Sequence, residues 1–331
     1  MNKISCVDHL LGQKLINLHP KQKGMAFAPT NIALCKYWGK RNAELNLPIN
    51  SSLSIALPDK GALTNLALRE DHDEVILNEQ ILAPNSTFVR RLQDYLNLFR
   101  PRRDWFLQIN IQMNIPVAAG LASSACGFAS LVMALNDLFE WQLNKSELSI
   151  LARLGSGSAA RSLWLGFVEW HAGVEENGLD SFAVPIVAEW PQLRVGILTF
   201  SEQEKPLSSR IAMQRTVDSS ALYQSWPNKV MNDMAMIKQA IHTNNFTLLG
   251  ETAESNALSM HATMLSSWPP IVYSLSETIT AMHHIWKCRA DGLPLYFTQD
   301  AGPNLKLLFL EQYETEVMQA FSNVSVIKLF E

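Results

Sequence analysis

The sequence predicts an α+β protein of two domains. Its 331 residues exceed the usual size of a single domain. Hydrophobic residues make up 47% of the chain and charged residues 18%, which suits proteins with sizeable cores and excludes disordered or fibrous chains. Segments with helical and strand periods follow one another in irregular order. These three observations favour an α+β fold over an all-helical or all-strand one.

The elements of the first half follow from periodicity and end signals. The first 25 residues are expected to be a loosely specified leader, and few periodicities are clear before Leu57. Beyond it the pattern predicts strands at 63–68, 74–77 and 105–113, helices at 86–99, 123–139 and 145–153, a Gly/Ser turn at 155–161 and an apolar run at 163–170. Asn144 and Glu147 have the spacing of a capping box, which fixes where the last of these helices begins.

A strand at 191–200 is expected to open the second half. The pattern there predicts helices around 228–249, 271–288 and 303–321, with strands near 294–299 and 324–329. We therefore expect two domains, at residues 1–190 and 191–331.

Charge and cysteine content exclude several classes of protein. A net charge of −4 gives no basic footprint, so we expect no nucleic-acid partner. Four cysteines without a C-x-x-C pair favour reduced thiols in a cytoplasmic protein over disulfides or a zinc site. Residues Ile115 to Leu135 carry no charge and are long enough to span a bilayer, but Pro116, Gly120 and several serines make the segment too polar. We expect no membrane partner.

Two small-residue loops could each hold an anion. The first, IPVAAGLASSAC at 115–126, lies between a predicted strand and helix, where backbone N–H groups and the helix dipole favour phosphate. Ser123 and Ser124 could cap the helix or offer hydroxyls to phosphate or magnesium. The second, GSGSAAR at 155–161, combines a backbone nest with the planar fork of Arg161. Close helix packing and a simple turn are the alternatives, but two such loops in one chain suggest two phosphorylated ligands.

Two further segments carry charges that could take part in chemistry. Lys36, Lys40 and Arg41 gather beside two aromatic residues, although a basic cluster could also be a solvated face. Asp300 follows a predicted strand and precedes a Gly-Pro turn. It could cap a helix, or it could meet a substrate hydroxyl as the base of a phosphoryl transfer.

In this order, the segments closely resemble the mevalonate diphosphate decarboxylase family of the GHMP small-molecule kinase superfamily. The matching pieces are NIALCKYWGKR with LNLPINSSLS, PVAAGLASSACGF, GSGSAARSLWLGFVEW, SSRIAM, HATMLSSWPPIVY and TQDAGPN, which extend from residue 31 to residue 304. The resemblance implies a two-domain GHMP-kinase-like fold with a deep cleft, and a homodimer. It also implies an enzyme that uses ATP and Mg²⁺ to convert mevalonate 5-diphosphate into isopentenyl diphosphate, ADP, phosphate and carbon dioxide, by 3-hydroxyl phosphorylation, phosphate loss and decarboxylation.

The resemblance also implies roles for individual residues. Asp300 corresponds to the catalytic aspartate, Lys36 to the lysine beside it and Arg161 to a basic residue that acts in both binding and turnover. The substrate contacts correspond to Tyr37, Lys40, Ser156, Ser158, Arg161, Ser209 and Arg210. The family's loop around the ATP phosphates corresponds to Ala118, Ala119, Gly120, Leu121, Ala122, Ser123 and Ser124, with Ser123 or Ser124 near magnesium.

One departure from the family pattern leaves alternatives open. Many members carry an arginine that reaches the diphosphate from the segment corresponding to 69–78, where this chain has His72, with Arg69 nearby. A mevalonate 5-phosphate decarboxylase and a mevalonate 3-kinase are therefore alternatives on the same scaffold. An alternative of another class is a non-catalytic nucleotide-binding or membrane-inserted protein built around residues 115–135.

Overall fold

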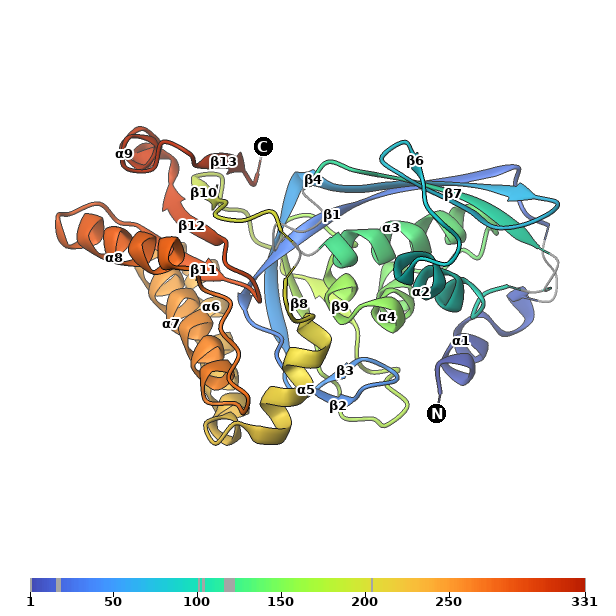
Figure 1. Ribbon diagram of the computed structural model, residues 1–331, viewed down its shortest axis with the longest axis horizontal. Coiled ribbons are helices and arrows are strands. Elements are labelled where there is room, and N and C mark those ends of the chain that lie inside the picture. The colour runs from blue at the N-terminus through green and yellow to red at the C-terminus, as the bar shows by residue number, and fades with distance from the viewer. Residues whose placement is uncertain are drawn as a thin grey trace.

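The computed structural model describes residues 2–15, 19–100, 102, 105–115, 123–203 and 205–330. Two large sheets organise this part of the chain, and β2 and β3 form a further sheet of two strands (Figure 1). The larger has the order β6-β5-β7-β4-β8-β9, with β1 also paired to β4. Its strands are β1 (Lys23–Cys35), β4 (Ser52–Arg69), β5 (Glu74–Leu77), β6 (Gln80–Ile81), β7 (Phe106–Met113), β8 (Phe167–Trp170) and β9 (Ala183–Pro185). All of these pairs are antiparallel except β5 with β7.

Three helices lie below the larger sheet in Figure 1: α2 (Thr87–Leu96), α3 (Ser123–Leu138) and α4 (Lys145–Gly155). Their positions confirm the three helices predicted from the sequence. Both capping signals of α4 are present, because Asn144 accepts from the backbone of Glu147 and the Glu147 carboxylate accepts from the backbone of Asn144. The Gly/Ser segment after α4 forms the 3-10 helix η2 (Gly157–Arg161).

The two longest strands, β1 and β4, were not predicted at their full length. In β1 every residue from Ala28 to Cys35 is buried. A strand covered on both faces has no alternation of polar and apolar residues, so the period of two is lost. The predicted strand at 63–68 is the last third of β4.

The smaller sheet has the order β11-β12-β10-β13, with all pairs antiparallel. Its strands are β10 (Leu193–Leu198), β11 (Tyr296–Gln299), β12 (Leu305–Leu310) and β13 (Ser325–Lys328). The accompanying helices are α5 (Ser209–Ser219), α6 (Trp226–Thr243), α7 (Phe246–Leu265), α8 (Ser276–Ala290) and α9 (Glu314–Ala320). The predicted α+β class is therefore confirmed.

Two predicted helices of this half were wrong in extent. The helix at 303–321 is replaced by β12, which lies between β10 and β11, and only the 3-10 helix η4 (Glu311–Tyr313) and α9 are helical. The apolar run LKLLFL suits a buried strand as well as a helix, so periodicity could not separate them. The helix at 228–249 is divided into α6 and α7 at Asn244, whose φ of 48° lies in the left-handed region.

The expected leader contains an ordered helix, α1 (Lys3–Leu11), followed by the 3-10 helix η1 (Gly12–Leu15). Asn2 caps α1 by accepting from the backbone of Ser5, and Cys6, Val7 and Leu11 are buried. The description of this segment as loosely specified was wrong, because a helix with a cap and a buried apolar face is a packed element.

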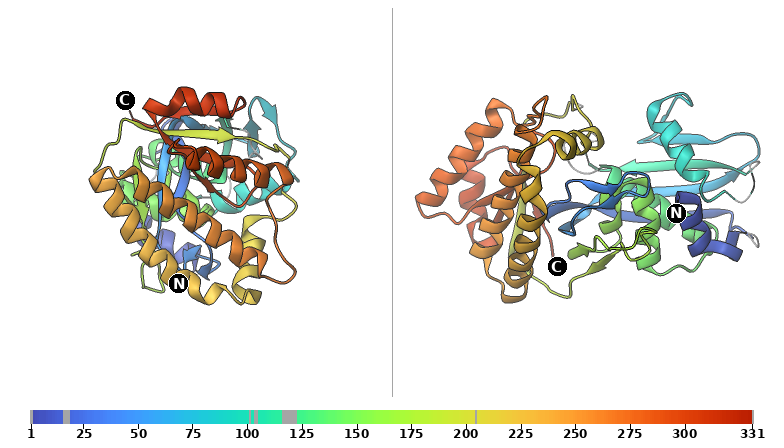
Figure 2. Two further views of the ribbon diagram at one scale, coloured as in Figure 1. Left: turned by 90° about the vertical axis from the view of Figure 1, so that its left-hand side faces the viewer. Right: turned by 90° about the horizontal axis from the view of Figure 1, so that it is seen from below.

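Helices α6 and α7 of the second half contact strand β1 of the first (Figure 2). At this junction the Trp38 carbonyl oxygen accepts hydrogen bonds from Tyr223 Oη at 2.9 Å and Trp226 Nε1 at 3.0 Å. Gly39 follows with φ +105°, and a Cβ there would lie 1.7 Å from Tyr223 Oη. A glycine is therefore required after Trp38, and the loop from Lys36 to Lys40 is held against the second half.

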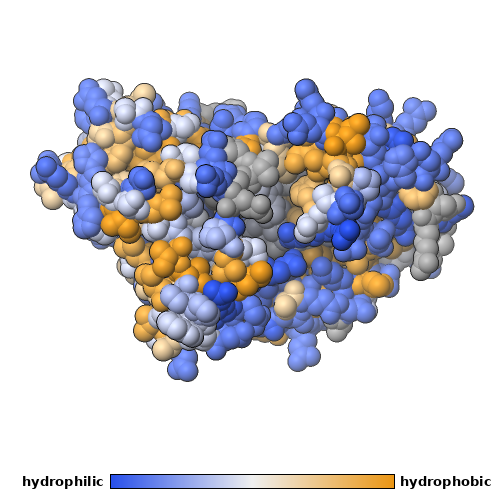
Figure 3. All heavy atoms as spheres, in the orientation of Figure 1, coloured by the Kyte–Doolittle hydropathy of each residue, from blue (hydrophilic) through white to orange (hydrophobic). Residues whose placement is uncertain are grey.

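Hydrophilic side chains cover most of the face in Figure 3, with apolar residues gathered in smaller patches. Within the described residues, no helix has the length and apolar character needed to cross a membrane.

Candidate active site

The centre of the site is an ion pair between residues 264 positions apart in the sequence. Lys36 directly follows β1, Asp300 directly follows β11, and Lys36 Nζ lies 2.7 Å from Asp300 Oδ1. The Lys36 side chain is 2% exposed and that of Asp300 is 26% exposed. The carboxylate is thus held by a buried lysine while remaining open to a ligand, and the structure brings together the two residues expected to be catalytic.

Two groups that sequence reasoning missed also hold Asp300. Lys306 of β12 approaches the second carboxylate oxygen, with Nζ 3.2 Å from Oδ2, and its side chain is 1% exposed. His261 of α7 lies with Nε2 3.1 Å from the Asp300 carbonyl oxygen. Lys306 lies two residues into a strand that was predicted as helix, so it carried no sequence signal. His261 begins the matching segment HATMLSSWPPIVY, but the match gave it no role.

The charges of these groups follow from burial and from one another. Burial alone would raise the pKa of Asp300, but the ammonium groups of Lys36 and Lys306 outweigh it and hold that pKa well below its usual range. Burial lowers the pKa of Lys36 to about 8, although Asp300 opposes the shift. Burial, followed by the charge of Lys36, lowers the pKa of His261 to about 4. Asp300 is therefore a carboxylate and His261 a neutral donor at pH 7.

The pKa of Lys36 predicts a fall in activity on the alkaline side. Lys36 is charged below about pH 8 and loses its proton as the pH rises through that value. Asp300 then loses its nearest cation, so we expect kcat at saturating substrate to decline above about pH 8. A kcat profile measured from pH 6 to pH 10 checks this prediction.

Lys40 provides the matched control, because burial lowers its pKa to about 8 as well. Replacing Lys40 with arginine, which stays charged throughout this range, should leave the decline in kcat in place. A kcat that stays level to pH 10, or a decline that disappears in K40R, would contradict the assignment to Lys36.

Arg161, at the end of η2, is held by two polar residues of the larger sheet. Its Nε and Nη2 lie 3.4 Å and 3.3 Å from Asn31 Oδ1, and its Nη1 donates to Ser52 Oγ. The guanidinium is 2% exposed and lies 5.9 Å from the centre of the Trp170 ring. Burial lowers its pKa to about 10, so it remains charged at neutral pH. Asn31 is a second residue that the motif match covered without assigning a role.

The two anion loops predicted separately lie in contact. Ser124 Oγ, in the first turn of α3, is 3.2 Å from Ser156 Oγ, which is 3.3 Å from Ser158 Oγ. Tyr37 packs beside them, since a Cβ on Gly157 would lie 2.8 Å from its ring. The buried Tyr37 hydroxyl has no hydrogen-bond partner among the described residues. These hydroxyls form a surface that suits phosphate oxygens.

The remaining predicted substrate contacts lie on nearby elements. Lys40 of β2 (Lys40–Asn42) donates to Asn46 Oδ1 at 2.7 Å, in the turn leading to β3 (Leu47–Pro48). Ser209 and Arg210 begin α5, and Lys205 Nζ donates to Ser209 Oγ at 3.1 Å. The pKa of Lys40 is lowered first by burial and next by the charge of Arg210, which places Arg210 within electrostatic reach of Lys40.

His72 and Arg69, which could replace the missing arginine, lie elsewhere. Arg69 ends β4, pairs with Asp71 and Glu74, and is separated from Ser52 by the length of that 18-residue strand, on the order of 50 Å. His72 is 58% exposed and lies against Asp71. The structure therefore brings neither side chain to the phosphate-binding surface.

Part of the predicted ATP loop lies outside the described residues, namely Ala118, Ala119, Gly120, Leu121 and Ala122. Ser123 and Ser124, which follow it, begin α3. In the described ranges no group of three or more His, Cys, Asp or Glu side chains could hold a metal ion. Serine hydroxyls at a helix start still fit Mg²⁺, because this ion takes most of its ligands from phosphate and water and few from protein.

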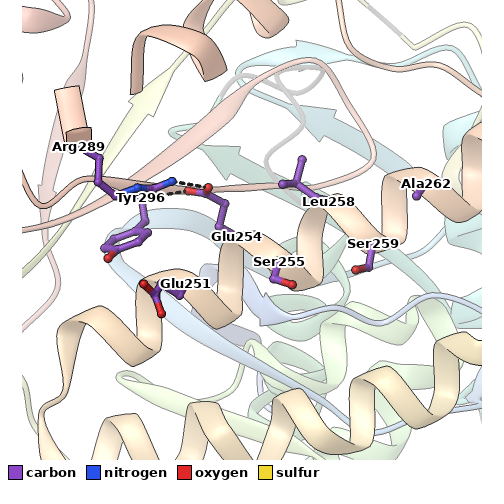
Figure 4. Close-up of a pocket in the computed structure, with 8 residues that line it drawn as sticks. All are labelled: Glu251, Glu254, Ser255, Leu258, Ser259, Ala262, Arg289 and Tyr296. Atoms are coloured by element: carbon purple, nitrogen blue, oxygen red, sulfur yellow. Dashed lines mark hydrogen bonds and ion pairs between the residues drawn. The ribbon is translucent and has the colours of Figure 1, made fainter. Parts of the chain in front are cut away.

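A pocket of about 480 Å³ opens away from these groups, along the side of α7 that faces Arg289 of α8 and Tyr296 of β11 (Figure 4). Glu254 forms a fork with Arg289, with distances of 2.8 Å and 3.0 Å. None of the predicted site residues lines this pocket.

Comparisons with known proteins agree with this arrangement. Residues 28–183 match the family described as diphosphomevalonate decarboxylase-like N-terminal domain, and residues 195–328 match the mevalonate 5-diphosphate decarboxylase C-terminal domain. The chain is 39% identical over 313 residues to the diphosphomevalonate decarboxylase of Aspergillus fumigatus, covering 88% of this chain and 77% of that protein. It is 37% identical to the enzyme of Bos taurus, covering 88% and 78%.

Solved structures are similar over nearly the whole chain. The mevalonate diphosphate decarboxylase of Staphylococcus aureus has a TM-score of 0.87 and 35% identity, covering 93% of this chain and 96% of its own. That of Enterococcus faecalis has a TM-score of 0.84 and 38% identity, covering 92% and 96%. A further structure, with a TM-score of 0.85, 38% identity and coverage of 92% and 96%, is described as MDDEF in complex with MVAPP, AMPPCP and magnesium. Together with both family matches, these relatives place the chain in the mevalonate diphosphate decarboxylase family, with its GHMP-kinase-like fold.

Proposed function

We propose that this chain catalyses the ATP-dependent decarboxylation of mevalonate 5-diphosphate to isopentenyl diphosphate, ADP, phosphate and carbon dioxide. The observation that carries the proposal is the partly exposed Asp300 carboxylate between two buried lysines. The named relatives and the complex with MVAPP, AMPPCP and magnesium agree with this activity and with ATP and Mg²⁺ as its requirements. The predicted enzyme class, an ATP-dependent carboxy-lyase, is thereby confirmed.

Asp300 would accept the hydrogen bond of the 3-hydroxyl and orient that oxygen toward the γ-phosphate. An ionised carboxylate with a strongly lowered pKa is a weak base, so orientation is the larger part of its role. Lys36 and Lys306 fix both carboxylate oxygens, which limits the directions from which the hydroxyl can approach. Mg²⁺, when bound, neutralises charge on the transferring phosphoryl group.

The other residues would bind the substrate and separate its charged groups from water. Ser156, Ser158, Tyr37 and Lys40 would receive the diphosphate, with Arg161 as the buried cation beside them. Ser209 and Arg210 would meet the carboxylate end. Ser123 and Ser124 would meet the ATP phosphates and magnesium, together with the loop from Ala118 to Ala122. No protein nucleophile is needed for the phosphate loss and decarboxylation that follow.

We further propose a division at residues 1–190 and 191–331, a homodimer, and a place of action in the cytoplasm. The division is supported by two sheets that share no strand among the described residues. The dimer and the compartment are extended from the family resemblance. Sedimentation equilibrium at several protein concentrations would distinguish the dimer from a monomer.

The proposed reaction predicts equal amounts of ADP and carbon dioxide. Purified protein is mixed with Mg-ATP and mevalonate 5-diphosphate, both products are followed, and the 5-monophosphate is tested in parallel. We expect one carbon dioxide for each ADP, with the diphosphate as the preferred substrate. ADP without carbon dioxide would instead identify a 3-kinase, and preference for the monophosphate would identify a 5-phosphate decarboxylase.

A further inference from the structure

Lys36 lies one residue beyond the strand pairing that fixes β1. The last pair joins Cys35 to Leu53, so the backbone of Lys36 takes no position from the sheet. Two side-chain amides hold it instead. The Lys36 N–H donates to Asn256 Oδ1 at 2.8 Å, and the Lys36 carbonyl oxygen accepts from Asn50 Nδ2 at 3.0 Å. Buried backbone groups need such partners, so the path of the chain into the reaction centre depends on these two amides.

Asn256 of α7 can hold Lys36 in only one of its two orientations, because its amide has an acceptor at one end and a donor at the other. Its Nδ2 donates to Asp233 Oδ2 of α6 at 2.7 Å, and both side chains are buried. A carboxylate can only accept, so Asp233 selects the nitrogen end of the amide. The oxygen end is thereby directed to the Lys36 N–H.

The Asp233 carboxylate is costly to bury, and its partner on α6 does not explain why it is there. Lys229, one turn earlier, places Nζ 2.5 Å and 2.6 Å from the two carboxylate oxygens and is 33% exposed. A buried ion pair adds little net stability, since both groups lose their water. An apolar side chain could fill the same space, whereas an acceptor is required at 233 to orient Asn256. The arrangement therefore fits orientation better than it fits stability.

We propose that Asp233 and Asn256 are positioning residues of the reaction centre, which fix the Lys36 backbone so that its ammonium meets Asp300. This inference rests on the proposed function and deepens it. From its present backbone position, Lys36 Nζ donates to the Ala33 carbonyl oxygen at 2.8 Å and to Asp300 Oδ1 at 2.7 Å. A shift of that backbone would lengthen both bonds, and Asp300 would lose one of the two lysines that direct its carboxylate.

The effect is expected on turnover and not on binding. The loop after Lys36 has its own anchor, because the Trp38 carbonyl oxygen accepts from Tyr223 and Trp226. Tyr37 and Lys40, which the proposed function gives to the diphosphate, lie on either side of that anchor in the sequence. A displacement of about 1 Å at a reacting group can cost about 10²-fold in rate. Loss of either positioning residue should therefore lower kcat while KM changes little.

Exchanging the two side chains provides the sharpest test. In N256D, two carboxylates would face each other where a hydrogen bond now spans 2.7 Å, and they would repel. In D233N, the new amide can accept either orientation of Asn256. In the swapped variant D233N/N256D, the carboxylate at 256 can accept from both the Lys36 N–H and the amide at 233, whose oxygen can accept from Lys229. Every bond is then restored without a change in net charge.

We expect kcat to fall about tenfold in D233N and about 100-fold in N256D. KM for mevalonate 5-diphosphate and the Kd of an ATP analogue should change less than about threefold in both, and the swapped variant should recover kcat to within about threefold of the wild type. The control is D73N. Asp73 is also a buried carboxylate, paired with Arg100 at 2.7 Å beside β5, so this variant should lose thermal stability and keep its kcat.

Two results would overturn the inference. One is a wild-type kcat in D233N with a lowered melting temperature, as in D73N, because Asp233 would then be a structural residue only. The other is a folded swapped variant whose kcat is no higher than that of the single variants. If N256D does not fold, the comparison of D233N with the swapped variant decides.

Hydrogen exchange of the Lys36 amide separates this inference from the proposed function, because it needs no turnover. In protein labelled with ¹⁵N-lysine, the Lys36 resonance is identified by its loss in K36R, and its exchange rate is measured by NMR. We expect the rate to rise about tenfold in D233N and to return in the swapped variant. This pattern in a protein that forms no carbon dioxide would overturn the function and leave the positioning intact. An unchanged rate in D233N would overturn the positioning.

Discussion

Replacing Asp300 with asparagine is expected to lower kcat by about 10³-fold. The amide keeps the size of the carboxylate but removes its charge, so Lys36 and Lys306 lose the anion that both contact at 2.7 Å and 3.2 Å. An amide also accepts the 3-hydroxyl hydrogen bond more weakly than a carboxylate does. Nucleotide affinity should be nearly unchanged, because the serines at the start of α3 are separate from Asp300. Steady-state kinetics and a titration with an ATP analogue check both statements.

Asp291→Asn serves as the control for this variant, since Asp291 is exposed at the end of α8. It should have the kcat of the wild type. A D300N enzyme that retains most of its kcat would remove Asp300 from its role. A D300N enzyme that no longer binds the nucleotide would mean that the charge of Asp300 organises the whole site and not the hydroxyl alone.

The second large effect is expected from replacing Arg161 with lysine. Lysine keeps the positive charge but cannot reproduce the planar guanidinium, which hydrogen-bonds to Asn31 and Ser52 at the same time. Because Arg161 is buried, solvent does not replace the lost bonds. We expect kcat/KM to fall by about 10- to 100-fold, with contributions from both kcat and KM.

Arg289→Lys is the matched control for Arg161. Arg289 also forms a fork, on Glu254, but it lies at the pocket beside α7 and not at Asp300. Its replacement should lower the melting temperature by an amount similar to that of R161K while leaving kcat/KM unchanged. Equal kinetics in R161K and the wild type would show that Arg161 is a structural residue only.

The sequence carried more information about the site than about the sheets that hold it. Lys36 and Asp300 were both expected from short motifs, and the family match implied that they meet across 264 positions. Helices with caps, such as α4, were predicted nearly to the residue, because caps are local signals. Strand β12 was not predicted, because its apolar run also suits a helix. Only its pairing with β10 and β11 decides between helix and strand.

Single polar residues in the core were the hardest to predict. His261 and Asn31 take their roles from Asp300 and Arg161, which are 39 and 130 positions away, and Lys306 reaches Asp300 only because β11 and β12 pair. Asn256 is a further case, because its Oδ1 accepts from the Lys36 backbone at 2.8 Å from a helix 220 residues away. No local pattern distinguishes these residues from polar residues that face solvent.

The hydrogen bonds between the second half and residues 36–38 have a consequence for the order in which the protein is synthesised and folds. Lys36 directly follows β1 of the first half, but its backbone N–H donates a hydrogen bond to Asn256 of the second half. The Trp38 carbonyl oxygen likewise accepts hydrogen bonds from Tyr223 and Trp226. Asp300 is translated 264 residues after Lys36, and Lys306 follows it in β12. The reaction centre is therefore complete only after β11 and β12 have been synthesised and have packed against a loop that was translated much earlier.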